Sequence, residues 1–324
     1  MPDKPSVLLT EPVFPDVMEL LKLHTNLTVG ERGTYNSESA LCDVIERYDG
    51  ILTMLSNPIT DKVINQGVNL KIISNYAVGY NNIQVDTATK KGIWVANTPD
   101  VLTRTTAEGT FALILATCRR LSTAENALRN GEFDGWHPTG FLGMDLTGKT
   151  LGILGMGRIG TELARLSKAF GLKIVYHNRQ RVSATIEEEL NAQYFPELES
   201  FISACDILSL NCPLNDETYH LMNEQTLSFM KKDSILINTA RGPVVDEAAM
   251  AKALHNQSIW GAGLDVFEHE PKVHPDLLTA PNTVLLPHIT SATYTTRRAM
   301  GMLAAGAILN VLCQKDMKCY FVNR

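Results

Sequence analysis

The chain has 324 residues, a length that suits about two domains. Hydrophobic residues make up 44% of it and charged residues 20%, as in ordinary globular proteins with a large core. The 29 basic and 35 acidic residues leave a net charge of -6 without a block of like charge, which excludes nucleic acid and anionic membranes as expected partners.

The six cysteines and the N-terminal sequence point to the cytoplasm. The cysteines are scattered and form neither a C-x-x-C pair nor a metal-like spacing, so we expect reduced thiols and no metal site. The N-terminus lacks the basic and apolar regions of a signal peptide. No apolar run approaches the roughly 20 residues of a membrane span. We therefore expect a cytoplasmic protein with no membrane association.

Short apolar runs alternate with helical patterns along the chain. Strands are predicted at 6–10, 50–54, 71–74, 93–96, 151–154, 173–176, 207–210, 234–238, 259–264 and 283–286. Helices are predicted at 17–23, 61–66, 108–120 and 292–312, with another opening directly after 160. This alternation favours parallel sheets with helices on both faces.

A glycine motif at mid-chain, behind a separate stretch of α/β sequence, indicates an inserted domain. We predict an α/β protein with two doubly wound parallel-sheet domains. Residues 1–101 and 290–324 would form a discontinuous, flavodoxin-like substrate-binding domain, and residues 102–289 a Rossmann-type dinucleotide-binding domain. Ligands of such sheets bind beyond the carboxyl ends of the strands, so the site is expected in a cleft between the domains.

The glycine motif has the order that a pyrophosphate requires. The strand at 151–154 leads into Gly155, Gly157 and Gly160, and a helix follows at once. The first glycine permits a tight turn, the second lets the backbone approach phosphates, and the third allows close packing of helix on strand. The motif also encloses two further candidate cofactor contacts, Arg158 and Ile159. The alternative is a glycine-rich turn of purely structural use.

The end of the next strand predicts which dinucleotide is bound. An acidic residue for the ribose hydroxyl of NAD is expected there, but residues 176–181 contain no carboxylate. Arg179 and Arg181 can instead neutralise the 2'-phosphate of NADP, and Asn178 can hydrogen-bond it. We predict NADP(H) as the preferred cofactor and NAD(H) as the alternative. A solvated basic loop is the competing interpretation.

Three later strands end in residues suited to redox chemistry on a 2-oxoacid. Arg241 follows one strand and can hold a carboxylate as a planar fork. A second strand is followed by three carboxylates, Asp265, Glu268 and Glu270. The last ends at His288, the side chain type best suited to move protons near neutrality, and a carboxylate beside it would fix its tautomer.

These residues carry a resemblance to a known family. The chain resembles the D-isomer-specific 2-hydroxyacid dehydrogenases, and within them the glyoxylate and hydroxypyruvate reductases, including those called 2-ketogluconate reductases. The resemblance covers nearly the full length, in motifs at 78–80, 106–108, 155–160, 213–218, 238–245, 263–271 and 287–293. It implies NADPH-dependent reduction of a small 2-oxoacid to a D-2-hydroxyacid.

The resemblance also implies roles for the residues at the strand ends. Arg241 would orient the substrate, and His288 would be the acid/base paired with Glu270, the carboxylate directly before a proline. The backbone amides of Val78 and Gly79 would hold the substrate carboxylate. Further cofactor contacts are implied at Thr106, Cys212, Pro213, Thr218, Thr239, Ala240 and Asp265, the last toward the nicotinamide amide.

The shape of the substrate pocket is less determined by the motifs. Loops at Leu55 and Trp136 would shape it, and Trp136 resembles a tryptophan that reaches the neighbouring subunit of a homodimer in the glyoxylate reductases. Two positions depart from the family pattern: Asn81 stands where Asp is frequent, and Thr290 where Gly is common. Thr290 adds bulk near the nicotinamide, so the preferred 2-oxoacid stays open.

Three alternative functions stand beside this one. A different enzyme class could use a metal held by the crowded residues Glu268, His269, Glu270 and His274, although their spacing matches no helical metal motif. A dinucleotide-sensing corepressor would use the same fold without turnover. Another dehydrogenase of the family, such as a phosphoglycerate dehydrogenase, is the third, whereas a formate dehydrogenase would carry Gln in place of Glu270.

Overall fold

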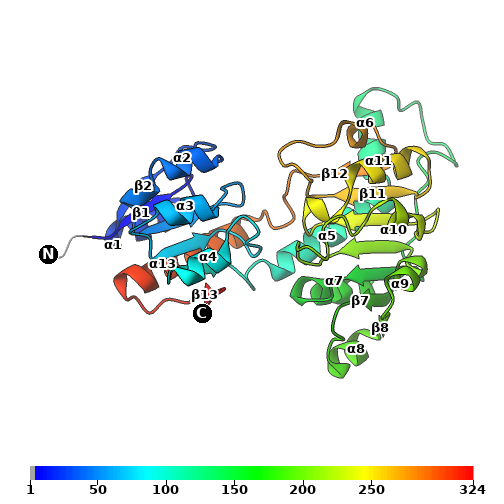
Figure 1. Cartoon of the computed structure of the whole chain (residues 1–324). Coiled ribbons are helices and arrows are strands. Elements are labelled where there is room, and N and C mark those ends of the chain that lie inside the picture. Colours follow the sequence, from blue (N-terminus) through cyan, green and yellow to red (C-terminus); the bar gives the residue numbers. More distant parts are fainter. Residues whose placement is uncertain (1–3, 324) are drawn as a thin grey trace. The chain divides into compact units, whose positions relative to one another are not determined.

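A computed structural model describes residues 4–323, which form two compact units with one sheet each (Figure 1). The first unit takes the chain up to Leu102 and from Ala292 onward, and the second takes Thr103–Ser291. The domain boundaries predicted from the sequence lie between residues 101 and 102 and between residues 289 and 290. The predicted α/β class with two largely parallel sheets is confirmed.

The first unit contains a six-stranded sheet in the order β13-β5-β4-β3-β1-β2. Its strands are β1 (Ser6–Leu9), β2 (Asn26–Val29), β3 (Gly50–Thr53), β4 (Ile72–Asn75), β5 (Trp94–Asn97) and β13 (Tyr320–Phe321). Its helices are α1 (Pro15–His24), α2 (Glu38–Cys42), α3 (Asp61–Gln66), α4 (Val85–Lys90) and α13 (Tyr294–Cys313), with a 3-10 turn at Ile45–Arg47. All pairings are parallel except that of β13 with β5.

The second unit contains a seven-stranded parallel sheet in the order β12-β11-β10-β9-β6-β7-β8. Its strands are β6 (Thr150–Leu154), β7 (Lys173–His177), β8 (Gln193–Tyr194), β9 (Ile207–Leu210), β10 (Ile235–Asn238), β11 (Gly261–Leu264) and β12 (Thr283–Leu285). Its helices are α5 (Thr103–Cys118), α6 (Leu121–Arg129), α7 (Arg158–Lys168), α8 (Ala184–Leu190), α9 (Leu198–Ala204), α10 (Glu224–Ser228), α11 (Glu247–His255) and α12 (Pro275–Leu278), with a 3-10 turn at Gly242–Val244.

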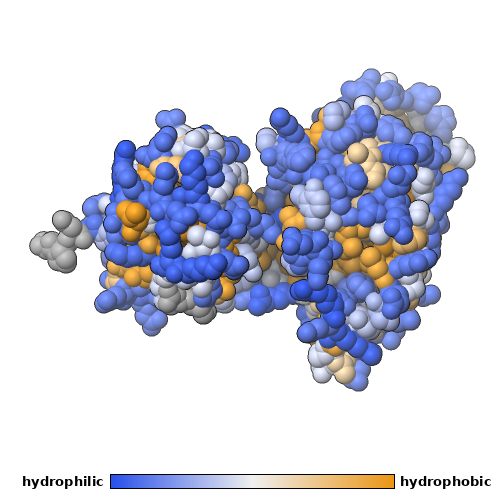
Figure 2. Space-filling model, viewed as in Figure 1, coloured by the Kyte–Doolittle hydropathy of each residue, from blue (hydrophilic) through white to orange (hydrophobic). Residues whose placement is uncertain are grey.

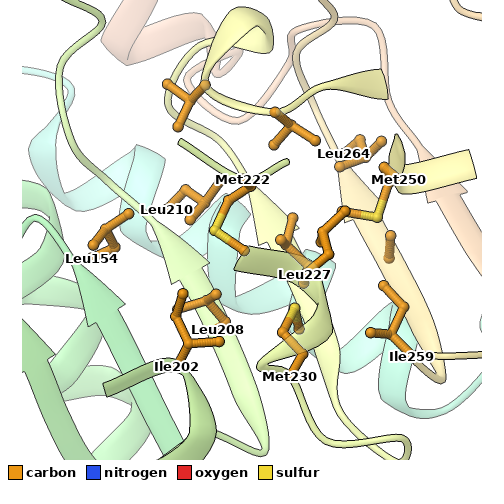
Figure 3. Packing of buried hydrophobic residues seen from close by; sticks show 14 of the residues in the cluster. Leu154, Ile202, Leu208, Leu210, Met222, Leu227, Met230, Met250, Ile259 and Leu264 are labelled. Atoms are coloured by element: carbon orange, nitrogen blue, oxygen red, sulfur yellow. The ribbon is translucent and has the colours of Figure 1, made fainter. Parts of the chain in front are cut away.

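Alternating side chains along the strands of the second sheet belong to two separate hydrophobic cores, one on each face of the sheet. On β10, Ile235 and Ile237 face the core shared with α5 and α7, whereas Leu236 faces the core shared with α9, α10 and α11. Figure 3 shows this second core, in which Met222, Met230 and Leu227 lie among leucines of β6, β9 and β11. Burial on both faces explains why these strands are nearly continuous apolar runs in the sequence.

The chain order makes β6 the switch point of the second sheet. From β6 the sheet continues on one side through β7 and β8, and on the other through β9, β10, β11 and β12. Doubly wound sheets bind their ligands at the carboxyl ends of the strands at such a point. Apart from Thr106, which lies on α5, the predicted cofactor and catalytic residues of this unit therefore follow strands that end at one edge.

Three strands were not predicted, and each lies at a sheet edge. β2 alternates between exposed and half-buried residues, and β8 and β13 have two residues each, so none gives a buried apolar run. Helix α5 also begins at Thr103 rather than at 108. The sequence does not indicate this early start, because the first turn is rich in threonine, which has a weak helix propensity. Threonine hydroxyls in this helix donate to carbonyls one turn earlier, as Thr110 does to Thr106 at 2.7 Å.

The surfaces of the units are mainly polar. Figure 2 shows hydrophilic residues over most of the face of each unit in view, with apolar residues exposed in smaller areas. Among the helices of residues 4–323, none is both long and apolar enough to cross a membrane.

Candidate active site

The glycine motif forms the turn between β6 and α7. Gly155 has φ +93°, and a Cβ there would lie 2.6 Å from the Cys212 nitrogen. A Cβ on Gly160 would lie 2.8 Å from the Gly155 oxygen, so both positions require glycine. A Cβ on Gly157 would meet no atom within 4 Å, and no side chain caps the helix that begins after it. The turn therefore leaves open space above the N-terminus of α7.

Asn178 fastens the end of β7 to this turn. Its Oδ1 accepts a hydrogen bond from the Met156 amide at 2.6 Å, and its carbonyl accepts one from the Tyr194 hydroxyl at 3.0 Å. A phosphate would need the Nδ2 donor of this side chain, which donates to the Met156 carbonyl at 3.5 Å, so the predicted contact would replace this long hydrogen bond and leave the bond of Oδ1 in place. Asn178 therefore fixes the position of the loop after β7 relative to the glycine turn, the two segments at which a dinucleotide is expected.

The two arginines after β7 differ in their surroundings. Arg181 forms a double hydrogen bond with Glu187, at 2.7 and 2.6 Å, and Glu187 also accepts from the Tyr176 hydroxyl. Arg179 makes one pair with Glu217 at 3.3 Å, and both side chains are more than two-thirds exposed, at 76% and 69%. An exposed pair of this kind contributes little and separates easily, so Arg179 is the arginine that can turn toward a phosphate.

Other candidate cofactor residues of this unit lie on α5 or after β9 and β10. Thr106 Oγ1 is buried and has no partner within residues 4–323, which marks it as an atom that a ligand could satisfy. The Oδ1 atom of Asn211, next to Cys212, is a second such atom. Thr218 donates to the Pro213 carbonyl at 2.6 Å and shapes the loop after β9, while Thr239 contacts Thr110 through their hydroxyls at 2.9 Å.

Arg241 projects from a turn that Asn238 holds at the end of β10. The Asn238 side chain accepts from the Ala240 amide at 3.0 Å and donates to the Arg241 carbonyl at 2.9 Å. The guanidinium donates to the Ala240 carbonyl at 2.6 Å. Burial lowers the pKa of Arg241, and the negative charge of Glu270 partly offsets this by raising it. An arginine nevertheless stays cationic at neutral pH.

Glu270 and His288 form the predicted pair. Nδ1 of His288 lies 3.1 Å from Oε2 of Glu270, and Oε1 of Glu270 accepts from the Phe267 amide at 3.1 Å. Burial raises the pKa of Glu270, but the hydrogen bond and charge of His288, the Phe267 amide and the charge of Arg241 together lower it. Because a carboxylate can only accept, Nδ1 carries a hydrogen and the ring is oriented.

Asp265 is buried beneath the turn that carries His288. Its Oδ1 accepts from the Ile289 amide at 2.7 Å, and its Oδ2 from the amide and hydroxyl of Thr290 at 2.9 and 2.8 Å. His288 itself has φ +57°, a left-handed conformation that is uncommon outside glycine. The carboxylate predicted to contact the nicotinamide is thus engaged by the turn, and Thr290 supplies two of its three hydrogen bonds, one of them from its side chain.

Two of the residues considered above as metal ligands, Glu268 and His274, have other hydrogen-bond partners. Glu268 pairs with His220 at 2.8 Å, and His274 Nδ1 accepts from the Asp276 amide at 3.3 Å at the start of α12. Within residues 4–323, no three His, Cys, Asp or Glu side chains are grouped to hold a metal ion.

The predicted substrate residues of the first unit lie on loops after β3 and β4. The side chain of Asn97 donates to the Val78 carbonyl and that of Asn75 to the Gly79 carbonyl, both at 2.8 Å. The C=O and N–H groups of a trans peptide point in opposite directions, so the amides of Gly79 and Tyr80 point away from these asparagines. Neither asparagine was predicted from the sequence, although Asn75 is the last residue of β4 and Asn97 the last of β5.

The other substrate candidates lie nearer the surface. Leu55 lines a hollow of about 280 Å³ in the first unit, together with polar side chains that include Asn81 and Gln84. Trp136, in the second unit, is 83% exposed. It follows α6 in an irregular connection that also exposes Phe133 and Leu142.

Comparison with known proteins places this geometry in a family. The family model of the D-isomer specific 2-hydroxyacid dehydrogenase, NAD binding domain, matches residues 111–290. The chain is 46% identical over 326 residues to a glyoxylate reductase of Aeropyrum pernix, covering 99% of this chain and 96% of the relative. A glyoxylate reductase of Thermococcus onnurineus is 45% identical over 306 residues, which cover 93% of this chain and 91% of the relative.

A solved structure extends the similarity to three dimensions. The NADPH-dependent glyoxylate/hydroxypyruvate reductase of Sinorhizobium meliloti, solved in complex with NADP and malonate, is similar with a TM-score of 0.87 and 34% identity. The match covers 99% of this chain and 97% of that one. The chain therefore belongs to the D-isomer specific 2-hydroxyacid dehydrogenase family of NAD(P)-dependent oxidoreductases.

Proposed function

We propose that the protein reduces small 2-oxoacids, such as glyoxylate and hydroxypyruvate, to D-2-hydroxyacids with NADPH as the preferred cofactor. The observation that carries the proposal is the Glu270–His288 pair, at 3.1 Å, with the charge of Arg241 acting on Glu270. An oriented acid/base beside a fixed cation suits the reduction of a carbonyl next to a carboxylate. The curated relatives named glyoxylate reductase support the same substrate class.

The residues of the second unit fit a dinucleotide. The open space above Gly157 and the uncapped start of α7 suit a pyrophosphate, and the unpartnered Thr106 hydroxyl offers a further polar contact. The turn of Gly155 to Gly160 would hold the phosphates, and the loops at Pro213 and Thr239 would flank the rest of the cofactor. When bound, the reduced nicotinamide supplies the hydride that adds to the 2-oxo carbon.

In the mechanism that we propose, His288 delivers the proton. As the 2-oxo carbon accepts the hydride, the electron pair of the C=O bond moves to its oxygen, which takes the proton from Nε2 of the His288 imidazolium. Glu270 holds the ring by Nδ1 and stabilises its positive charge until the transfer. Arg241 would hold the substrate carboxylate and polarise the carbonyl, and we propose the Val78 and Gly79 amides as further contacts of that carboxylate.

The preference for NADPH rests on Arg179. Its exposed pair with Glu217 leaves it able to bind a 2'-phosphate, whereas the Nε–Nη2 edge of Arg181 is held by both carboxylate oxygens of Glu187. No carboxylate stands at the end of β7 to accept hydrogen bonds from the ribose of NAD. The NADP complex of the Sinorhizobium meliloti enzyme supports this assignment.

A panel of 2-oxoacids assayed with NADPH and with NADH tests the proposal. We expect glyoxylate or hydroxypyruvate to be reduced with a kcat/KM of about 10⁴ M⁻¹s⁻¹ or more, at least about 10-fold higher with NADPH. Tight NADPH binding without turnover of any 2-oxoacid would instead indicate the sensor function. Equal or better efficiency with NADH would refute the cofactor preference alone.

We also propose a homodimer that forms through the segment around Trp136. Large apolar side chains are exposed along this segment: Leu121, Leu128, Phe133, Trp136, Phe141 and Leu142. Such a concentration marks an interaction surface more often than a solvated one. Light scattering after gel filtration should give a dimer for the wild-type protein, and a monomeric mass would contradict the assignment.

A further inference from the structure

A second glutamate, Glu247, lies behind the loop that carries Glu270. It is the first residue of α11 and only 5% exposed. Resting on the proposed function, we propose that Glu247 is a positioning residue that clamps both ends of this loop and so presents Glu270 to His288.

The clamp consists of two backbone hydrogen bonds. One oxygen of Glu247 accepts from the Glu268 amide at 2.5 Å, and the other from the His274 amide at 2.9 Å. Glu270 lies on the segment between these two amides. A carboxylate that bonds both ends of a short loop fixes the loop's span, and losing one of the bonds would leave a buried polar group unpaired.

Glu247 is itself held firmly. The side chain of Asp246 caps α11 by accepting from the Ala249 amide at 3.0 Å, and the Asp246 amide donates to the Met222 carbonyl at 2.9 Å. Helix α11 packs between α10 and α12 and contributes Met250 and Leu254 to the core. A negative charge in the first turn of a helix is also favoured by the helix dipole.

The same loop is fixed at its start by the Arg241 turn. A Cβ on Gly242 would lie 1.9 Å from the Phe267 carbonyl carbon, so the two backbones are in direct contact. The Phe267 amide then donates to Glu270. Glu247 thus completes a frame in which the loop is fixed next to Arg241 at one end and against α11 at both 268 and 274.

The other titratable groups near Glu247 are directed elsewhere. The Glu268 side chain pairs with His220 at 2.8 Å and lies 3.9 Å from the ring of His269. The His274 ring caps α12. Around Glu270, the charged neighbours are His288 and Arg241. A change at Glu247 should therefore reach the chemistry through the position of Glu270.

The variant Glu247→Gln tests this role, because its amide group keeps the shape but turns one acceptor into a donor that faces an N–H. We expect kcat to fall about 10-fold with the NADPH Kd within about twofold of wild type, since only the loop is disturbed. The acid limb of kcat/KM should move to higher pH, because Glu270 loses part of the pairing that keeps it ionised. Glu224→Gln on α10, which removes an exposed pair with Lys252, is the matched control and should behave as wild type.

A double-mutant cycle separates positioning from general stability. If Glu247 acts through Glu270, then Glu247→Gln should reduce kcat by less than about twofold in a Glu270→Gln background. An equal fall in both backgrounds, or an unchanged kcat and acid limb in the single variant, would overturn the proposal. If Glu247→Gln does not fold, Glu247→Asp, which keeps the charge on a shorter side chain, takes its place in the cycle.

Amide hydrogen exchange keeps the test independent of turnover. Exchange across residues 267–274 should quicken by about 10-fold or more in Glu247→Gln, with α7 and its glycine turn unchanged. If the wild-type protein reduces no 2-oxoacid, the proposed function is refuted. The exchange measurement would still decide whether Glu247 holds the loop. An unchanged exchange rate in this loop would contradict the proposal that Glu247 holds it in place.

Discussion

His288 and Glu270 come from loops after neighbouring strands, β12 and β11, and meet at 3.1 Å through Nδ1 and Oε2. We predict that Glu270→Gln lowers kcat about 10²-fold, because the amide no longer stabilises the charge of the proton donor. The NADPH Kd should stay within about twofold. Steady-state assays and fluorescence titration check this, with Glu268→Gln as control: Glu268 pairs with His220 and should be replaceable with a loss of less than about threefold.

The lowered pKa of Glu270 predicts how stability depends on pH. Because its pKa is lower in the folded protein than in the unfolded chain, ionised Glu270 stabilises the fold above its unfolded pKa of about 4.3. That contribution is lost as the pH falls through the folded pKa. The Tm of wild type should therefore exceed that of Glu270→Gln by more at about pH 6 than at about pH 3. Thermal unfolding of both proteins measures the difference, and a gap that widens in acid would show that the sign is wrong.

Thr290 is expected to stabilise the turn that holds His288. Thr290→Val removes the hydroxyl that donates to the buried Asp265 but keeps the side-chain volume, so the free energy of unfolding should fall by about 1–3 kcal/mol. Thr290→Ser keeps the donor and should lose less than about 1 kcal/mol. Urea unfolding at neutral pH checks both variants. Equal losses in the two would mean that the methyl contact, and not the hydrogen bond, is what matters.

The strand ends were predictable because buried parallel strands have a strong sequence signal. Ile235 to Asn238 and Gly261 to Leu264 are buried on both faces and mostly apolar, so the residues after them, Arg241 and Glu270, could be assigned to one edge of a sheet. Choosing Glu270 over Glu268 needed the family resemblance. Spacing alone does not say which of two carboxylates in one loop turns toward the histidine, and the structure directs Glu268 to His220 instead.

The supporting residues could not be predicted, because their roles depend on long-range contacts. Glu247 reads as an ordinary acidic residue in the first turn of a helix, yet it bonds amides that lie 21 and 27 residues further along the chain. Asn75 and Asn97 read as polar strand ends, and only the fold shows that they bind the carbonyls of Gly79 and Val78. Likewise, Arg179 and Arg181 look equivalent in the sequence, and only the structure shows that Arg181 is paired with Glu187.

The two arginines after β7 should respond differently to removal. Arg179→Ala should raise the KM for NADPH by about 10-fold or more and leave the KM for NADH within about twofold, because only NADPH carries the 2'-phosphate. Arg181→Ala should change the ratio of the two KM values by less than about threefold, since Nε and Nη2 of its guanidinium already bond the two carboxylate oxygens of Glu187. Initial rates with each cofactor provide the comparison, and the opposite ranking would reassign the phosphate contact to Arg181.

Replacing two glycines of the same turn by alanine should have different effects: Gly157→Ala should weaken NADPH binding, and Gly160→Ala should lower stability. Gly157 has a φ of -85° and open space where a Cβ would stand, so Gly157→Ala should fold with a Tm close to wild type but fill part of the space for the pyrophosphate. Gly160→Ala would place its Cβ 2.8 Å from the Gly155 oxygen and 2.9 Å from a methyl group of Ile153, which should lower the free energy of unfolding by about 1–3 kcal/mol. Calorimetric titration with NADPH should show at least about 10-fold weaker binding for Gly157→Ala, since a methyl group would stand between the backbone and the phosphates. NADPH binding at wild-type strength in a well-folded Gly157→Ala protein would place the pyrophosphate away from this turn.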